Sequence, residues 1–289
     1  MDKNEIYQYA GFHAEEIAEL ERDRCSLNRK ASLFSFNTKK LQFEPLVVSC
    51  HDSAHDLNNE VDQPQCRAHL FLLIDNLPFA ISEMQKKNIP DDIIRATFSD
   101  ISLWSRNYKR QFGVYGLSSR IWEWVSHHLG GKLYQLGLLQ FEVAPLSLEV
   151  GGVCTGDPIL KVHIPEGRRL LSDLCDQSFQ QAEWFFKDIL PYDFQAYIFD
   201  SWLCDQELMR LLPESSNILK FVKRFIPVSQ SVVKNDEIYQ RVFGGRAVQT
   251  GTVDYPLKTS LQKILYPYFK EKILFGSGVG IILKDPSEL

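Results

Sequence analysis

Two segments decide the fold of this 289-residue chain, ILKVHI (159–164) and AYIFDSW (196–202). Each is an apolar run of strand length, and Pro165 closes the first because proline cannot donate to a β-ladder. Between them, residues 172–190 place apolar side chains at helical spacing, with Ser172 as the expected N-cap. A strand, a helix and a strand of this size predict a parallel pair with a right-handed crossover connection.

Polar side chains stand where these two strands end. His163 closes the first strand, and Asp200 and Ser201 close the second. Because parallel strands bring their carboxyl ends to one edge of a sheet, we expect these residues to meet across one crevice, where open sheets hold ligands. Each also has a purely structural interpretation: His163 bonded to a backbone carbonyl, and Asp200 and Ser201 capping the next turn.

An earlier apolar run, residues 136–143, follows the glycine pair at 130 and 131 and is expected to form one strand. Glu142 lies near its end. This carboxylate is a second candidate for holding an amine or acting as a base, and the alternative is an ordinary exposed strand residue.

The loop after the first strand, Glu166–Leu170, contains features suited to an anion. The following helix offers its amino-terminal N–H groups, and Arg168 and Arg169 add two guanidinium donors, which suits a phosphate or pyrophosphate. Gly167 permits a positive φ or a close backbone approach. The two arginines are otherwise solvated surface charges. An anion site beside a reaction crevice indicates a donor with a nucleotide tail.

The length of 289 residues allows one large domain or two ordinary ones, of which we expect two, and the composition is that of a soluble globular protein. Hydrophobic residues make up 44% and the net charge is −5, which disfavours nucleic acid as a partner. No apolar run is long enough for a membrane span. The six cysteines show no paired spacing and the start of the chain is polar, so we expect a cytoplasmic protein.

The first lobe is expected to be mainly helical and to end at residue 117, where glycines interrupt the pattern. Residues 4–24 read as one amphipathic helix. Metal binding is not expected, because Cys50, His51 and His55, with Cys66 or His69 beyond them, lack the spacing of a zinc site.

The helix predicted over 118–129 begins the second lobe. Trp122 and Trp124 either line a ligand cleft or are core or lobe-interface residues, and His127 and His128 suit the negative end of this helix.

Six ordered motifs resemble a family of bacterial acyltransferase-domain proteins with a helical N-terminal region and a GNAT-like C-terminal domain. They are 122–129, LGLLQFE (136–142), HIPEG (163–167), DSWL (200–203), SNI (216–218) and TSLQ (259–262). The resemblance implies an α+β fold, with a helical acyltransferase-associated domain over 1–117 and a GNAT-like mixed sheet with flanking helices over 118–289. In that fold an acyl-thioester donor enters a V-shaped opening, here between 159–164 and 196–201.

The resemblance implies acyl transfer from a thioester to an amine or hydroxyl group. It does not identify the acceptor, which is a small molecule or a peptide. Its loop would bind the pyrophosphate of acyl-CoA or acetyl-CoA through Gly167, Arg168, Arg169 and Leu170. The usual donor-loop pattern is absent, because Gly167 is followed by Arg168, Arg169 and Leu170. An acyl carrier protein therefore remains an alternative donor, and no metal is implied.

Acyl transfer assigns a role to each candidate residue. His163 is the general base, because imidazole titrates near neutrality. Asp200 orients His163 or holds the acceptor's ammonium group, Ser201 donates to the oxyanion or the leaving sulfur, and Glu142 is the second base.

Two other classes of protein compete with this interpretation. A non-catalytic binding or regulatory protein on the same scaffold would explain the absent loop pattern. A hydrolase using Ser201, His163 and Asp200 lacks the G-x-S-x-G turn that its nucleophile needs.

Overall fold

A computed structural model describes residues 1–30, 63–147, 149, 150 and 152–284 of the chain. The chain forms two compact units, Met1–Leu136 and Gly137–Leu289. The division expected at 117/118 lies before α6 (Ser119–Leu129), whereas in the structure α6 packs with the helices of the first unit. Cys50, His51 and His55 lie outside the described residues.

The first unit is helical up to its last strand. Its elements are α1 (Lys3–Tyr9), α2 (Ala14–Lys30), α3 (Gln63–Lys86), α4 (Asp91–Phe98), α5 (Asp100–Phe112), α6 and β1 (Leu133–Leu136). The single helix expected over 4–24 is wrong, since α1 ends at Tyr9 and Gly11 has φ +83°. A side chain at Gly11 would meet Ser99 and Ser102, so this glycine lets the chain turn against α5.

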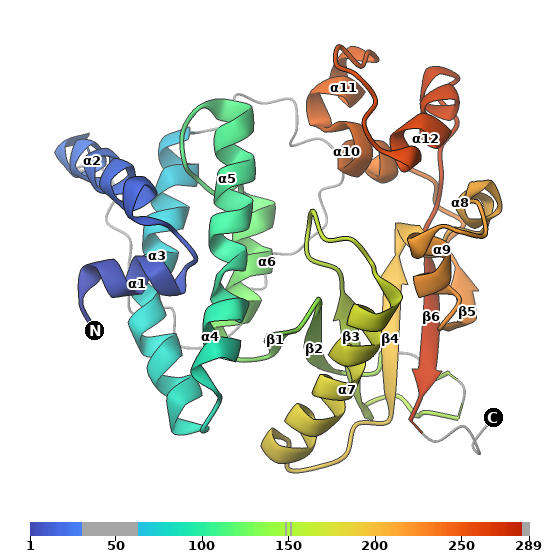
Figure 1. Cartoon of the computed structure of the whole chain (residues 1–289), viewed down its shortest axis with the longest axis horizontal. Coiled ribbons are helices and arrows are strands. Elements are labelled where there is room, and N and C mark those ends of the chain that lie inside the picture. Colours follow the sequence, from blue (N-terminus) through green and yellow to red (C-terminus); the bar gives the residue numbers. More distant parts are fainter. Residues whose placement is uncertain (31–62, 148, 151, 285–289) are drawn as a thin grey trace. The chain divides into compact units, whose positions relative to one another are not determined.

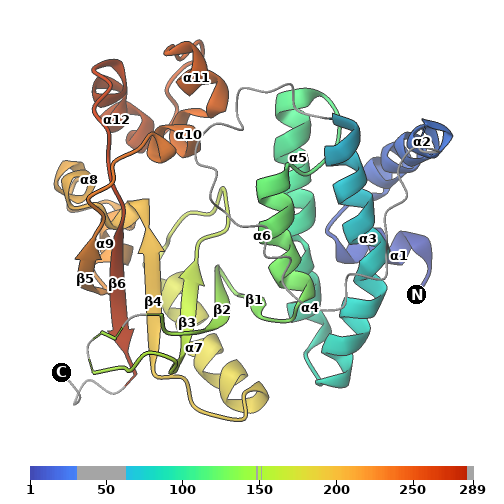
Figure 2. The same ribbon diagram turned by 180° about the vertical axis from the view of Figure 1, so that it is seen from behind.

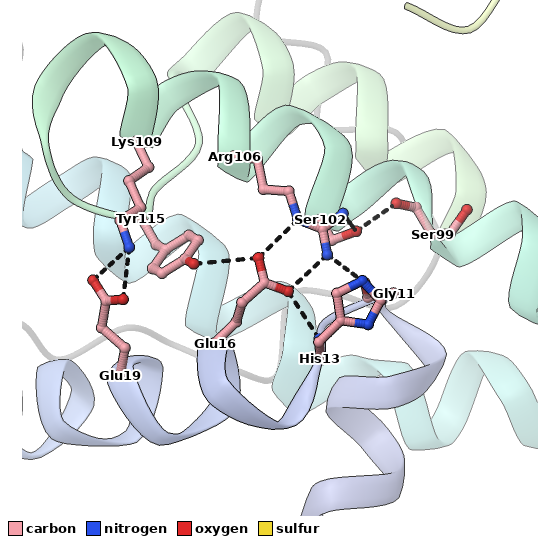
Figure 3. A network of polar contacts seen from close by, with 9 residues as sticks. All are labelled: Gly11, His13, Glu16, Glu19, Ser99, Ser102, Arg106, Lys109 and Tyr115. Carbon is pink, nitrogen blue, oxygen red and sulfur yellow. Dashed lines mark hydrogen bonds and ion pairs between the residues drawn. The ribbon is translucent and has the colours of Figure 1, made fainter. Parts of the chain in front are cut away.

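A polar network ties the start of α2 to α5 (Figure 3). Arg106 donates to both carboxylate oxygens of Glu16 at 2.7 Å, and to the Gly11 carbonyl at 2.8 Å. The Glu16 carboxylate also accepts from the His13 amide and the Tyr115 hydroxyl. The hydrogen bonds from Arg106 lower the pKa of Glu16 to about 2.

The second unit is built on a mixed sheet. Its strands are β2 (Leu139–Pro145), β3 (Pro158–His163), β4 (Ala196–Ser201), β5 (Ile226–Gln230) and β6 (Gly278–Leu283), in the order β2-β3-β4-β6-β5. Only β3 and β4 pair in parallel among these described strands, and the other neighbours are antiparallel. The helices are α7 (Ser172–Ile189), the 3₁₀ turn η2 (Trp202–Cys204), α8 (Gln206–Leu211), α9 (Asn217–Val222), α10 (Glu237–Phe243), α11 (Gly245–Thr250) and α12 (Ser260–Lys270).

The parallel pair with α7 as its crossover helix confirms the expected organisation of 159–201. The α+β fold, with a helical N-terminal region and a mixed sheet, is confirmed as well. The N-cap of α7 is Leu171, so the expected cap at Ser172 is wrong; Ser172 instead accepts a bond from Arg224.

The strand expected over 136–143 is interrupted. Gly137 has φ +61°, and the chain turns there between β1 and β2. A Cβ at this position would lie 2.8 Å from the Ser178 hydroxyl of α7, which accepts from the Leu138 amide at 2.7 Å. The Ser178 hydroxyl of α7 therefore fixes the start of β2. The apolar pattern of residues 136–143 continues through the turn and did not indicate this break.

Aromatic packing fixes α7 on one face of the sheet. Phe179 of α7 lies 5.7 Å from Phe141 of β2 and 5.0 Å from Tyr197 of β4, both edge to face. The helix lies in front of the strands in Figure 1 and behind them in Figure 2. The site-bearing strands are therefore held rigidly from this side.

The Glu16 network predicts acid sensitivity of the first unit. Because the pKa of Glu16 is lowered from 4.5 to about 2, its stabilisation is complete above pH 4.5 and is lost as the pH falls towards 2. Glu16→Gln should cost about 2 kcal/mol of unfolding free energy at pH 7, allowing for solvent screening, and almost nothing at pH 2. Urea unfolding at both pH values measures the difference.

The control for this variant is Glu15→Gln, which removes an exposed carboxylate from the same helical turn. It should change the unfolding free energy little at either pH. Equal losses in both variants would contradict a specific contribution from the Arg106 contact.

Candidate active site

The parallel pairing of β3 with β4 is shorter than either strand. Among the described residues it ends where Lys161 lies opposite Ile198. Strand β3 nevertheless continues to His163, paired with Gln140 of β2, and β4 continues to Ser201, paired with β6. The carboxyl ends of the two strands therefore separate while each keeps its outer partner.

One face of the sheet carries the polar candidates. Ile159, Ala196 and Ile198 belong to an apolar cluster on this face. Because side chains alternate along a strand, His163 lies on the same face as Ile159, and Asp200 on the same face as Ala196 and Ile198. The two predicted residues thus share a face at the separating strand ends.

Glu142 is the residue that contacts His163. Its Oε2 lies 3.0 Å from Nε2 of the imidazole, and Glu142 is 9% exposed. The antiparallel register explains the contact, because Gln140 lies opposite His163 and Glu142 opposite Lys161, which makes Glu142 a diagonal neighbour of His163. The sequence singled out both residues but did not pair them.

Asp200 lies at the exposed end of β4. Partial burial among the packed strand ends raises the pKa of its carboxyl group, and the nearby charge of Glu237 raises it further. The charges of Lys161 and His163 act in the opposite direction. Glu237 begins α10, so this helix contributes to the electrostatics of the strand end.

Ser201 serves as the cap of the following turn. Its hydroxyl oxygen accepts from the Leu203 amide at 3.1 Å, as the structural interpretation of this residue predicts. A serine hydroxyl that accepts one bond still has its own hydrogen to donate.

The loop between β3 and α7 presents its two arginines to solvent. Gly167 has φ +76°, the left-handed conformation that glycine allows, and a Cβ there would meet nothing within 4 Å. Arg168 and Arg169 are exposed, whereas Leu170 is buried with 6% exposure. Leu170 therefore offers only its backbone to a ligand.

Arg224, just after α9, is a residue that the sequence gave no reason to single out. It donates to the backbone carbonyl and hydroxyl of Ser172 and to the carboxylate of Asp176. These residues lie about fifty positions earlier in the chain, and no local pattern indicates such a contact. The contact places a third guanidinium at the start of α7.

The tryptophans of α6 have structural roles in the first unit. Trp122 stacks on His69, and Trp124 donates from Nε1 to Asp100 at 3.0 Å. His128 is fully buried with Nε2 3.3 Å from the same carboxylate. Both tryptophans are partly buried and make these contacts within the first unit, and His128 contacts an acidic side chain in addition to lying at the helix end.

The described part of the chain contains neither a cluster of metal-ligating side chains nor a helix suited to a membrane. No group of three or more His, Cys, Asp or Glu side chains is arranged to hold a metal ion. Within the same residues, no helix combines the length and the apolar composition that crossing a membrane requires.

A mixed sheet whose parallel pair separates at its carboxyl ends, followed by a loop and helix, defines a GNAT-like domain. Residues 133–282 match the GNAT-like C-terminal domain, and residues 1–131 match the N-acyltransferase N-terminal domain. The chain therefore belongs to the family that combines an N-acyltransferase N-terminal domain with a GNAT-like C-terminal domain.

Solved structures with a similar fold are acyltransferase complexes. One is an acyltransferase mutant with octanoyl-CoA, at 24% identity and a TM-score of 0.65, covering 74% of this chain and 65% of that one. Another is an acyltransferase with decanoyl-CoA and teicoplanin, at 24% identity and a TM-score of 0.65, covering 75% and 66%. The chain thus spans just under two thirds of their length. A search of the curated proteins found no match.

The charges around Asp200 predict two opposite shifts. Lys161→Met should raise the pKa of Asp200 further, because it removes the cation that favours the carboxylate. Glu237→Gln should lower this pKa, because it removes a repelling anion. Carbon-13 NMR titration of labelled aspartate carboxyl groups measures both shifts.

The control is Lys187→Met, at the exposed end of α7, which should leave the pKa of Asp200 unchanged. Shifts of the Asp200 pKa in the same direction in both test variants would refute this arrangement of charges.

Proposed function

We propose that the chain transfers an acyl group from acyl-CoA to an amine of a small molecule or peptide, at the separated ends of β3 and β4. The contact between Glu142 and His163 at the end of β3 carries this proposal, because it provides an oriented base beside the opening. The similar structures support the donor, since they are complexes with octanoyl-CoA, decanoyl-CoA and CoA. The teicoplanin in two of them supports an acceptor with peptide character.

The donor's phosphates fit the loop before α7. Arg168 and Arg169 are exposed there, and the positive end of the α7 dipole favours an anion. Gly167 has no side chain that would keep the pyrophosphate from the backbone. Leu170 contributes a backbone group to this proposed site and anchors the loop through its buried side chain.

His163 is proposed as the general base. The Glu142 carboxylate at Nε2 orients the imidazole ring, and an imidazole can take up the proton of the attacking amine near neutral pH. As the amine nitrogen bonds to the thioester carbon, its proton passes to His163 and the carbonyl oxygen becomes an oxyanion. Collapse of this intermediate re-forms the carbonyl and breaks the carbon–sulfur bond, and the departing thiolate takes up a proton.

Asp200 and Ser201 have auxiliary roles in the proposed reaction. The Asp200 carboxylate attracts the acceptor as an ammonium ion. The Ser201 hydroxyl has a hydrogen to donate to the departing sulfur. Both residues lie on β4, across the opening from His163.

We also propose that the protein is bacterial and cytoplasmic. Cys25, Cys66, Cys154, Cys175 and Cys204 are free thiols, which fits a reducing compartment.

Loss of the base should remove turnover without removing donor binding. His163→Gln is expected to lower kcat by about 100-fold to 10,000-fold and to leave the Kd for decanoyl-CoA within about threefold. Turnover is measured as CoA thiol release with decanoyl-CoA as donor and glucosamine or a lysine peptide as acceptor probe. His13→Gln, at an exposed position in the first unit, is the control; equal activity of wild type and His163→Gln would refute the assigned base.

Loss of the loop cations should weaken donor binding. Arg168→Ala combined with Arg169→Ala is expected to raise the Kd for decanoyl-CoA about tenfold or more, because two charge-assisted phosphate contacts disappear. Isothermal titration measures the change, with Lys187→Ala as a control on the far end of α7. Absence of any heat with wild-type protein would favour a carrier-protein donor or a non-catalytic binding protein.

A further inference from the structure

Gln140 is a buried polar residue beside the proposed base His163. It lies on β2 directly opposite His163, and strand alternation puts it on the same face as Glu142. Paired residues of an antiparallel ladder have their Cβ atoms about 5 Å apart. The side chains of Gln140 and His163 are therefore neighbours on one face of the sheet at the end of β3.

The Gln140 side chain is buried without a partner for its nitrogen. The residue is 2% exposed, and among the described residues no acceptor lies within hydrogen-bonding distance of Nε2. Folded proteins seldom leave a buried amide donor unsatisfied, because desolvating it costs free energy that no bond returns. An apolar side chain of similar shape would serve packing better, so packing alone does not explain a glutamine here.

The chemistry of this donor restricts its ligand. A carboxamide N–H is neutral and donates to an oxygen, and a carbonyl oxygen that gains negative charge is the acceptor that benefits most from such a donor. Beside a base that deprotonates an attacking amine, the oxygen in question is that of the thioester carbonyl.

We propose that Gln140 is a catalytic residue whose Nε2–H group binds the carbonyl oxygen of the acyl thioester and stabilises the oxyanion. This inference rests on the proposed acyl transfer. When the amine nitrogen bonds to the carbonyl carbon, the carbon–oxygen π pair moves onto the oxygen and strengthens the bond from Gln140. When the carbon–sulfur bond breaks, that pair re-forms the carbonyl. Gln140 neither gains nor loses a proton, and its burial keeps it in position before the reaction.

Gln140→Leu tests the proposal because catalysis and stability should respond differently. With decanoyl-CoA as donor and a lysine peptide as acceptor probe, kcat should fall about 100-fold to 1,000-fold while KM for decanoyl-CoA changes less than about threefold. The Tm should stay the same or rise, because the variant removes an unpaired buried donor. Gln140→Met, which keeps the length of the side chain and loses the donor, should lose kcat to at least the same extent.

Gln135→Leu is the matched control, since Gln135 is also a buried glutamine, with 6% exposure, and belongs to β1. Its kcat should remain near the wild-type value. Wild-type-like kcat in Gln140→Leu, or a kcat loss accompanied by a clear fall in Tm, would overturn the role of Gln140 and leave the proposed function intact. Failure of wild-type protein to release CoA with any acceptor probe would overturn the proposed function and this inference together.

Discussion

The separation of β3 from β4 is the constraint on which the rest of the second unit depends. The two strands share hydrogen bonds only as far as Lys161 and Ile198. Each strand keeps an antiparallel partner on its other side, β2 for β3 and β6 for β4, so the backbone hydrogen bonds outside the opening are retained. A sheet can therefore open between two inner strands because the pairing on both flanks continues to hold them.

One face of this sheet packs against α7, and the other carries the polar residues of the candidate site. Edge-to-face aromatic contacts between α7 and the strands make one face a rigid support. The other face is apolar over Ile159 and Ala196 and becomes polar only at the strand ends, where Glu142 and His163 meet. Reactive side chains on strands braced from behind keep their geometry better than side chains on loops.

The N-terminal unit has its own internal polar anchors. Glu16 and Arg106 connect α2 with α5, and Asp100 receives the indole N–H groups of Trp104 and Trp124. These contacts lie wholly within the first unit, as expected of a domain with a separate core. The separate set of contacts agrees with the match of residues 1–131 to the N-acyltransferase N-terminal domain.

The sequence by itself determined the local elements: the strand, loop, helix and strand over 158–201, the left-handed Gly167 and the polar residues at the strand ends. Hydrophobic period, proline and glycine act within a few residues, so these features can be read locally. Only the tertiary structure decided that Glu142, rather than Asp200, contacts His163 and that Gln140 lies opposite it. Only the tertiary structure likewise brought Arg224 to the start of α7 and broke the apolar run at Gly137. These outcomes depend on strand register and on helix packing between residues far apart in the chain. A one-residue shift in the register of β2 would have moved Gln140 and Glu142 to the other face of the sheet.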